Sequence, residues 1–281
     1  MALGRHEGKP NTRQSHQANL AAFGFERLGT YAEGAPHLMH VEVFDLLKTL
    51  VKRAIDACPG PEVKVLDLGA GEGSVARLWL SQNAMVTAVD LSSAMLTELE
   101  AKCGAQAARL KCVTMDASEY LTACDERFDI VSCISFLHHV PDYLALIRLS
   151  LQALSRHGIF LTFADPIRYD TLRPAERLFE QVAYTMWRLG RPDVWGGIRR
   201  RLRRTRGIYS VDSIFDNAEY HVTRNGVDQD SIIQMLHQNG IWVDVITYWS
   251  TQSALFQRLG SLLGCKSNFS VFARKFETLH A

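Results

Sequence analysis

Short apolar runs alternate with amphipathic patterns along the middle of the chain. Five runs have the length and composition of strands buried on both faces, and they lie at residues 63–68, 84–89, 110–115, 128–134 and 159–164. Apolar residues at helical spacing separate them, and the last such helix, from residue 143 to about 155, is expected to stop at His157 and Gly158. Strands that alternate with helices predict an α/β fold with a doubly wound parallel sheet.

The chain that precedes these strands divides into two parts. Residues 1–22 are polar and contain few large apolar side chains, which predicts a flexible arm. Residues 23–60 are predicted to form a helical lid or cap, because apolar residues recur at helical spacing between residues 41 and 57.

The alternation of strands and helices is interrupted after Pro166. Pro174 can occupy the first turn of a further helix, in which Leu178 and Val182 belong to an apolar repeat. The core pattern returns near residue 229, with a helix followed by strands at 241–249 and 268–273. The predicted core therefore comprises residues 61–165 and 229–281, and residues 166–228 form an insertion between the fifth and sixth strands, on the substrate side of the sheet.

The first strand runs into a turn with three glycines, Gly69, Gly71 and Gly73. Glycine can take positive φ and lets a ligand come close to the backbone. Two cofactor classes use a glycine turn at this place, the dinucleotides and S-adenosylmethionine. The GxGxG spacing departs from the GxGxxG of dinucleotide sites, and the acids Asp67 and Glu72 would repel a pyrophosphate. An acid at position 67 instead favours a ligand that carries an ammonium group.

Four motifs give the chain its resemblance to the class I S-adenosylmethionine-dependent methyltransferases. They are DLGAGEG at 67–73, VTAVDLS at 86–92, MDA at 115–117 and FDIVSCISFLHHV at 128–140, and they agree with the family in order and spacing. The resemblance covers about residues 60–165 and 229–275. It implies a Rossmann-like sheet of seven strands whose last strand is antiparallel, with S-adenosylmethionine as the cofactor.

The resemblance also implies a role for individual residues. Asp67 would hold the ammonium group of the cofactor, and Asp90 would accept hydrogen bonds from both ribose hydroxyls, as a carboxylate at a strand end can. Ser93 is in position to cap the helix that follows Asp90. The other cofactor-binding residues implied by the resemblance are Gly69, Ala70, Gly71, Leu91, Asp116, Ala117 and Ser132.

Methyl transfer from a sulfonium is an in-line displacement, and it does not oblige the enzyme to supply a base. Holding the acceptor in line can provide roughly 7–11 kcal/mol of the barrier. A hydroxyl acceptor would nevertheless favour a histidine of near-neutral pKa as base. The catalytic candidates are His139, after the fourth strand, for which a loop-ordering role is the alternative, and His221, in the insertion. The candidate substrate-binding residues are Tyr31, His37, His138 and Tyr220.

Composition narrows the choice of partners and compartment. The 281 residues carry a net charge of +1 with both signs mixed, which argues against nucleic acid as a partner. The six cysteines contain no CxxC pair, so we expect reduced thiols, a cytoplasmic protein and no metal site. The sequence contains no apolar run long enough to span a membrane and no apolar signal segment near its start.

A local run of basic residues departs from this balance. The run that begins at Arg199 and ends at Arg206 holds six arginines in eight residues. It is either a solvated helix face, a handle for an anionic substrate, or a peripheral contact with anionic lipid headgroups.

Together these patterns predict a methyltransferase that acts on an oxygen, or next a carbon, of a small or carrier-linked metabolite. The segment SFLHHVPD after the fourth strand lacks the Pro-Pro-aromatic motif that is common among methyltransferases of nucleobase nitrogens. Two alternatives remain open. One is an enzyme that binds the same cofactor and catalyses a non-methylating reaction such as cyclisation, and the other is a non-catalytic partner protein. The sequence does not indicate an oligomeric state.

Overall fold

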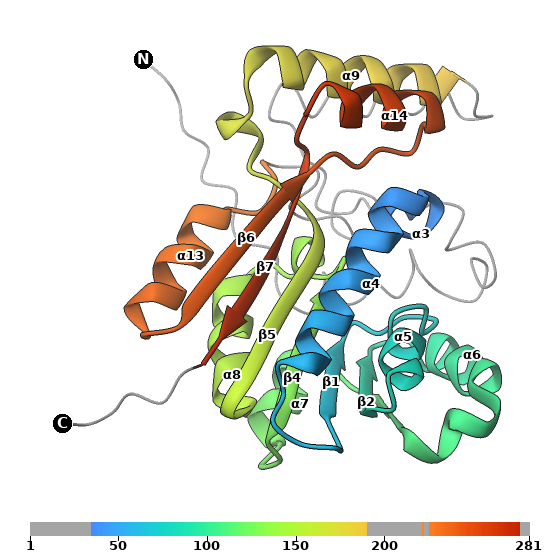
Figure 1. Ribbon diagram of the computed structural model, residues 1–281, viewed down its shortest axis with the longest axis vertical. Helices are drawn as coiled ribbons and strands as arrows, with labels where there is room; N and C mark the ends of the chain where they lie inside the picture. The colour runs from blue at the N-terminus through green and yellow to red at the C-terminus, as the bar shows by residue number, and fades with distance from the viewer. Residues whose placement is uncertain (1–34, 190–220, 222–224, 276–281) are drawn as a thin grey trace.

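The computed structural model describes residues 35–189, 221 and 225–275, and within these ranges the strands form one sheet (Figure 1). The strand order is β3-β2-β1-β4-β5-β7-β6. The strands are β1 (Lys64–Leu68), β2 (Met85–Asp90), β3 (Leu110–Thr114), β4 (Phe128–Ile134), β5 (Leu154–Pro166), β6 (Trp242–Tyr248) and β7 (Asn268–Arg274). Strands β1 to β5 pair in parallel, whereas β7 is antiparallel to both β5 and β6. The predicted doubly wound, seven-stranded sheet with an antiparallel last strand is therefore confirmed.

Helices cover both faces of the sheet, and each face has its own apolar core. One face packs against α4 (Val41–Asp56), α5 (Ala76–Ser81) and α6 (Ser93–Cys103), and the other against α7 (Ala117–Ala123), α8 (Tyr143–Ala153) and α13 (Gln229–Gln238). Shorter helical turns are α3 (Pro36–Met39), η2 (Gly104–Arg109), η3 (Leu137–His139) and η4 (Tyr169–Thr171). Both faces of the central strands are thus buried, as their nearly continuous apolar sequences require.

Helix α4 shows how the sequence directs an element onto the sheet. Val43, Leu47, Leu50, Val51 and Ala54 form one stripe at helical spacing, and none of them is more than 3% exposed. Burial of a leucine side chain contributes about 1.5–3 kcal/mol, so this stripe fixes α4 against the strands. Because α3 precedes α4 directly, it is held at the carboxyl end of the sheet.

Helix α9 (Pro174–Leu189) confirms the helix expected after Pro174, but the apolar residues of its repeat, Leu178, Val182, Met186 and Leu189, are all exposed. Leu178 is 63% exposed and Met186 is 54% exposed. The helix packs instead through Phe179, whose ring lies 5.3 Å from Trp249 and 5.5 Å from Phe256 of α14 (Ala254–Leu262). Figure 1 shows α9 and α14 side by side beyond the end of β5.

The structure corrects two local predictions. Ser92, not Ser93, caps α6, because its hydroxyl accepts a hydrogen bond from the N–H of Met95. The helix expected to reach about residue 155 ends at Ala153, and β5 begins at once with Leu154, which pairs with Phe128 of β4. His157 and Gly158 therefore lie inside the strand and do not stop a helix. The arm at residues 1–22 and most of the insertion lie outside the described residues.

Candidate functional site

The glycine turn lies where the strand order reverses, between β1 and β4. In open parallel sheets a ligand crevice forms at this place, beyond the carboxyl ends of the strands. Gly69, Gly71 and Gly73 all have positive φ, at 71°, 55° and 84°. A Cβ on Gly69 would lie 2.2 Å from the ring of Phe136, and one on Gly73 would lie 2.1 Å from Leu99. A Cβ on Gly71 would meet nothing within 4 Å, so this glycine borders open space.

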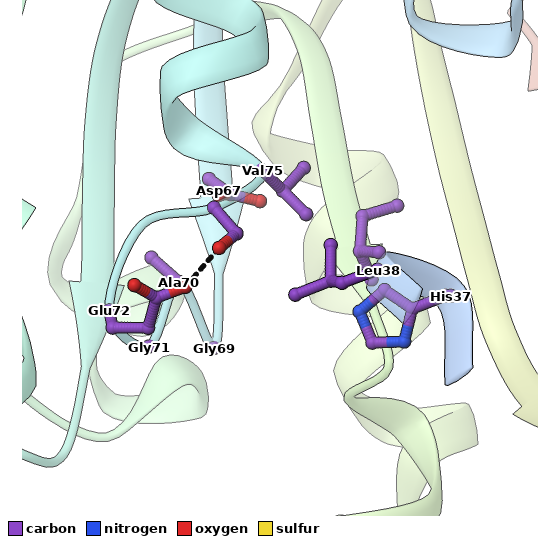
Figure 2. A pocket seen from close by; sticks show the side chains of 10 residues that line it. His37, Leu38, Asp67, Gly69, Ala70, Gly71, Glu72 and Val75 are labelled. Carbon is purple, nitrogen blue, oxygen red and sulfur yellow. Dashed lines mark hydrogen bonds between the residues drawn. The ribbon is translucent and has the colours of Figure 1, made fainter. Parts of the chain in front are cut away.

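That open space is a hollow of about 340 Å³, including the part that opens to solvent. Figure 2 shows the glycine turn on one side of it, and His37 and Leu38 of α3 on the other. Asp67 and Glu72 contribute carboxylates to its lining. The hollow is therefore bounded by an acidic turn and by the N-terminal helical segment.

Asp67 is the group in this hollow whose hydrogen bonding is incomplete. Its Oδ1 accepts a hydrogen bond of 2.6 Å from the hydroxyl of Ser132, but its Oδ2 is buried and has no partner among the described residues. Burial raises the pKa of Asp67 to about 7. The hydrogen bond from Ser132 lowers this pKa, and the charge of the nearby Asp90 raises it further. An unpaired carboxylate oxygen beside a hollow suits a ligand with a cationic N–H donor.

Asp90 connects the glycine turn to the end of β2. Its Oδ2 accepts a hydrogen bond of 2.8 Å from the N–H of Gly71, and its Oδ1 accepts one of 2.8 Å from the N–H of Ser92. Burial raises the pKa of Asp90, whereas these backbone N–H groups and that of Leu91 lower it. Each carboxylate oxygen can accept two hydrogen bonds, so the side chain that shapes the turn keeps capacity for a ligand.

The remaining predicted cofactor residues lie along the same edge but not in the hollow. Asp116 caps α7, and its Oδ1 accepts hydrogen bonds from the N–H groups of Ser118 and Glu119 at 2.9 and 3.0 Å. Ala117 is buried in the first turn of that helix, and Leu91 is partly exposed beside Asp90. These three residues lie at the ends of β2 and β3, on the far side of Asp90 from the hollow.

Glu72 carries the second carboxylate of the hollow, and a cation balances it. It accepts hydrogen bonds from Lys102 of α6 and from Ser74. Burial alone would raise the pKa of Glu72, but these two hydrogen bonds and the charge of Lys102 together lower it. Glu72 is thus ionised and paired, which distinguishes it from Asp67.

His37 reaches the hollow because α3 is anchored at its far end. The adjacent His40 is buried, and its Nε2 lies 2.6 Å from the carbonyl oxygen of Thr251, to which it donates a hydrogen bond. His37 itself is only 4% exposed. Burial, with a smaller contribution from His138, lowers the pKa of His37 to about 4, so it is a neutral imidazole.

A pair of side chains behind the hollow was not predicted. His138 lies in η3, and both its Nδ1 and its backbone N–H donate to Oδ1 of Asp165, at 2.8 and 3.0 Å. Asp165 ends the part of β5 that faces the site, and it is completely buried. The only sequence signal for it was its position, since Asp67 and Asp90 also stand at or next to the ends of apolar runs.

The two predicted catalytic histidines lie near this pair. The ring of His139 is 4.0 Å from that of His138, at an angle of 45°. Nε2 of His221 lies 3.0 Å from the carbonyl oxygen of Val140 and donates to it, while its ring meets Tyr143 edge to face at 4.9 Å. The structure thus brings His37, His138, His139 and His221 to one end of the sheet.

Some predicted site residues fall outside the described part of the chain, and that part contains neither a metal-ligand cluster nor a membrane-spanning helix. Tyr31, Tyr220 and the run from Arg199 to Arg206 lie outside the described residues. In the part of the chain that the structure describes, no cluster of three or more histidine, cysteine or acidic side chains is placed to hold a metal ion. Likewise, none of the described helices combines the length and apolarity needed to cross a membrane.

Comparison with known proteins agrees with the motifs. Residues 65–158 match the family model described as a methyltransferase domain. This match confirms, for that part of the chain, the resemblance on which the site residues were chosen. A ubiquinone biosynthesis O-methyltransferase of Pasteurella multocida is 32% identical over an alignment of 105 positions, which covers 34% of this chain and 43% of that protein. The chain therefore aligns with less than half the length of this relative.

Solved structures share the fold over a larger part of the chain. The 1,6-didemethyltoxoflavin-N1-methyltransferase of Burkholderia thailandensis, determined with S-adenosylhomocysteine, covers 98% of this chain and 94% of its own at 14% identity and a TM-score of 0.55. A cyclase of the 4+2 type covers 82% of this chain and 80% of its own at 14% identity and a TM-score of 0.51. At such low identity these similarities establish the common fold.

Proposed function

We propose that this chain, in which residues 65–158 form a domain of the methyltransferase family, is an S-adenosylmethionine-dependent methyltransferase that methylates an oxygen of a small or carrier-linked metabolite. The proposal rests on Oδ2 of Asp67, which is buried beside the hollow and has no hydrogen-bond partner among the described residues. The cofactor carries an ammonium group at one end and a sulfonium cation at its centre, so a buried carboxylate that lacks a partner matches it.

The rest of the edge fits the same ligand. The ammonium group would bind to Asp67, with the backbone of Gly69, Ala70 and Gly71 alongside the methionine part, since a Cβ on Gly71 would project into open space. The ribose hydroxyls would bind to Asp90 at the end of β2. Adenine would lie toward Leu91, Asp116 and Ala117, while Ser132 holds Asp67 in place.

S-adenosylmethionine supplies an electrophilic methyl group on sulfur, and the chain supplies position. The sulfonium would face the end of β4, where η3 carries His138 and His139. His37 and Leu38 line the side of the hollow opposite the glycine turn. Orientation of acceptor and methyl group can account for about 7–11 kcal/mol of the barrier.

Oxygen is the proposed acceptor atom for two reasons. Curated relatives that align with the domain, such as those of Pasteurella multocida and Histophilus somni, are named O-methyltransferases. In addition, several histidines gather at the methyl end of the site, and a hydroxyl acceptor must lose a proton when it is methylated. His139 and His221 remain candidate catalytic residues, and His138 and His37 candidate substrate contacts. Tyr31 and Tyr220 belong to the segments that would complete the acceptor site.

Two measurements test the proposal. Isothermal titration calorimetry should detect binding of S-adenosylmethionine by the purified chain. Mass spectrometry after incubation with the cofactor and a fraction of hydroxyl-containing metabolites should then find S-adenosylhomocysteine and a product heavier by one methylene unit. If the chain does not bind the cofactor, the proposal is wrong at its first step.

The cyclase that shares the fold makes a non-methylating reaction the second candidate. In that case the cofactor would bind and remain intact, and the product would have the same mass as its substrate. A non-catalytic partner protein would bind the cofactor and give neither product. The mass difference and the amount of S-adenosylhomocysteine therefore separate the three functions.

A further inference from the structure

We propose that Asp165 and His138 form a proton-accepting pair for the acceptor hydroxyl, with His138 Nε2 as the accepting atom and Asp165 as the residue that positions and charges it. The inference deepens the proposed function and rests on it. His138 touches the acceptor in this arrangement, whereas Asp165 acts only through His138.

The hydrogen bonds determine which ring nitrogen is available. Oδ1 of Asp165 lies 2.8 Å from Nδ1 of His138, and it also accepts from the backbone N–H of His138 at 3.0 Å. An oxygen that accepts from this N–H is best matched by a proton on Nδ1, which leaves Nε2 with a free lone pair. Among the described residues no hydrogen bond is made to Nε2 of His138.

A bulge in β5 brings Asp165 to His138. Between Thr162 and Asp165 the strand advances three residues while its partner β7 advances two, from Val271 to Phe269. Ala164, in between, takes the left-handed conformation at φ 63°, which is strained for a residue with a Cβ. Its N–H is held by a hydrogen bond of 2.8 Å to the hydroxyl of Tyr248.

The extra residue reverses the direction of the side chains that follow it. Ile159, Leu161 and Phe163 belong to the core under α4, α5 and α6, and unbroken alternation would send Asp165 to the same side. After the bulge, Asp165 instead meets η3, whose Leu137 belongs to the opposite core. Bulges are common next to active sites, where they change the direction of a side chain. This bulge turns the carboxylate of Asp165 toward the candidate site.

The pair has the geometry of an ion pair, but burial opposes charge on both partners. Burial raises the pKa of Asp165 to about 8, although the N–H of His138 and the His139 ring lower it, and burial lowers the pKa of His138 to about 3, helped by His221. Between these values the pair holds a single titratable proton and no net charge. Above about pH 8 it loses that proton, and the ionised Asp165 then makes His138 a stronger base.

Neutral groups surround the pair on most sides. His37 of α3 is uncharged because burial lowers its pKa to about 4. Cys133 of β4 and Tyr248 of β6 are uncharged because burial raises the pKa of each well above its ordinary value. Within the described ranges, the other titratable groups facing the pair are the imidazoles of His139 and His221. The proton of the pair thus responds mainly to an incoming ligand.

The proposed step moves one proton and one methyl group. The acceptor's O–H bond breaks and its proton moves to Nε2 of His138, while the oxygen's electron pair forms a bond to the methyl carbon. S-adenosylmethionine, when bound, would supply this methyl carbon, and the electron pair of its former bond to sulfur would stay on sulfur. The cation formed on His138 is neutralised by the ionised Asp165 at 2.8 Å, so the pair ends without net charge.

Ring NMR of the full-length chain, labelled with ¹⁵N in its histidines and free of cofactor, tests the pair without any need for turnover. The His138 signals are assigned as those missing in His138→Gln. In the wild type we expect a neutral ring with its proton on Nδ1 at pH 7, and one change of its signals with a midpoint near pH 8. Asp165→Asn keeps a carbonyl oxygen for both hydrogen bonds, so it should retain the Nδ1 proton and lose the change near pH 8.

Asp165→Ala should lose both the Nδ1 preference and the pH step, whereas Asp170→Asn, the same loss of charge five residues later, should leave the His138 signals as they are. The pair is overturned if His138 carries its proton on Nε2, or if Asp165→Asn keeps the step near pH 8.

Calorimetry separates this result from the proposed function: Asp165→Asn should bind S-adenosylmethionine within about twofold of the wild type. Absence of cofactor binding by the wild type would reject the proposed function and leave the NMR result unchanged.

Discussion

Asp67 and Ser132 lie opposite each other on the neighbouring parallel strands β1 and β4, and the serine hydroxyl donates a hydrogen bond of 2.6 Å to one oxygen of the carboxylate. The pairing divides the carboxylate into two parts. One oxygen is satisfied inside the sheet. The other is buried beside the hollow, and no group in the described part of the chain hydrogen-bonds to it. Burial of this unpaired oxygen costs free energy, and a bound cationic ligand can offset that cost.

Asp67→Asn should weaken the binding of S-adenosylmethionine at least tenfold, because it removes a charge-assisted hydrogen bond worth about 1.5–3 kcal/mol. Binding by the wild type should also become stronger as the pH rises toward and past 7, since the cationic ligand prefers the ionised form of a carboxyl whose pKa is raised to about 7. The variant should have no such pH dependence. Calorimetry between pH 5.5 and 8.5 measures both effects, and equal affinities would remove Asp67 from the site.

The same variant should be more stable than the wild type when no ligand is present. The unfolded chain loses the Asp67 proton near pH 4, whereas the folded chain loses it near pH 7, so the contribution of Asp67 to stability falls as the pH rises through that window. Asparagine cannot ionise, and its oxygen still accepts from Ser132. We expect Asp67→Asn to gain on the order of 1–4 kcal/mol at pH 7.5 and little at pH 4. Urea unfolding at both pH values checks the difference, and a loss of stability at pH 7.5 would contradict it.

Gly71→Ala and Gly240→Ala compare backbone strain at the hollow with backbone strain away from it. The two glycines have positive φ, 55° and 66°, and a Cβ on either meets nothing within 4 Å among the described residues. An alanine at positive φ costs about 1–2 kcal/mol of unfolding free energy, so both variants should be destabilised. Only Gly71 borders the hollow, so only Gly71→Ala should weaken S-adenosylmethionine binding tenfold or more. Parallel thermal unfolding and calorimetry of the two variants test this, and similar affinities would place the cofactor away from the turn.

Asp90→Asn should reduce cofactor affinity tenfold or more. Its carboxylate accepts from Gly71 and Ser92 at the same time, and an amide must turn its NH₂ group toward one of these N–H donors. The variant thus disturbs the turn as well as the proposed ribose contact. Asp125→Asn is the control, because that exposed carboxylate precedes β4 at the opposite edge of the sheet. If calorimetry gives the same affinity for Asp90→Asn as for Asp125→Asn, the ribose assignment is wrong.

Features that depend on a few adjacent residues could be predicted from the sequence, and features that depend on distant contacts could not. The strands, the glycine turn and the acids Asp67 and Asp90 could be predicted because apolar periodicity and a strand-end acid are properties of a few adjacent residues. The bulge that turns Asp165 toward His138 depends on pairing with β7, which lies more than 100 residues later in the chain. No residue next to Asp165 in the sequence indicates this bulge.

The difference between His138 and His139 has the same origin. The two residues share a short turn of 3₁₀ helix, in which side chains point in directions that a three-residue pattern cannot specify. The sequence therefore indicated histidines just after β4 but not which of them faces an acid. Helix α14 was missed as well, although Leu255, Leu259 and Leu262 stand at helical spacing, because they face outward and no periodic burial was expected between the last two strands.

His40→Ala tests whether α3 is part of the site or only next to it. The imidazole of His40 donates to the carbonyl oxygen of Thr251, and its removal leaves a buried acceptor unpaired, which costs about 1–3 kcal/mol of unfolding free energy. Because α3 also carries His37 and Leu38 into the hollow, loosening it should weaken S-adenosylmethionine binding several-fold. His237→Ala, at an exposed position near the end of α13, should change neither quantity measurably. A destabilised His40→Ala that binds the cofactor as tightly as the wild type would show that the glycine turn holds the ligand without help from α3.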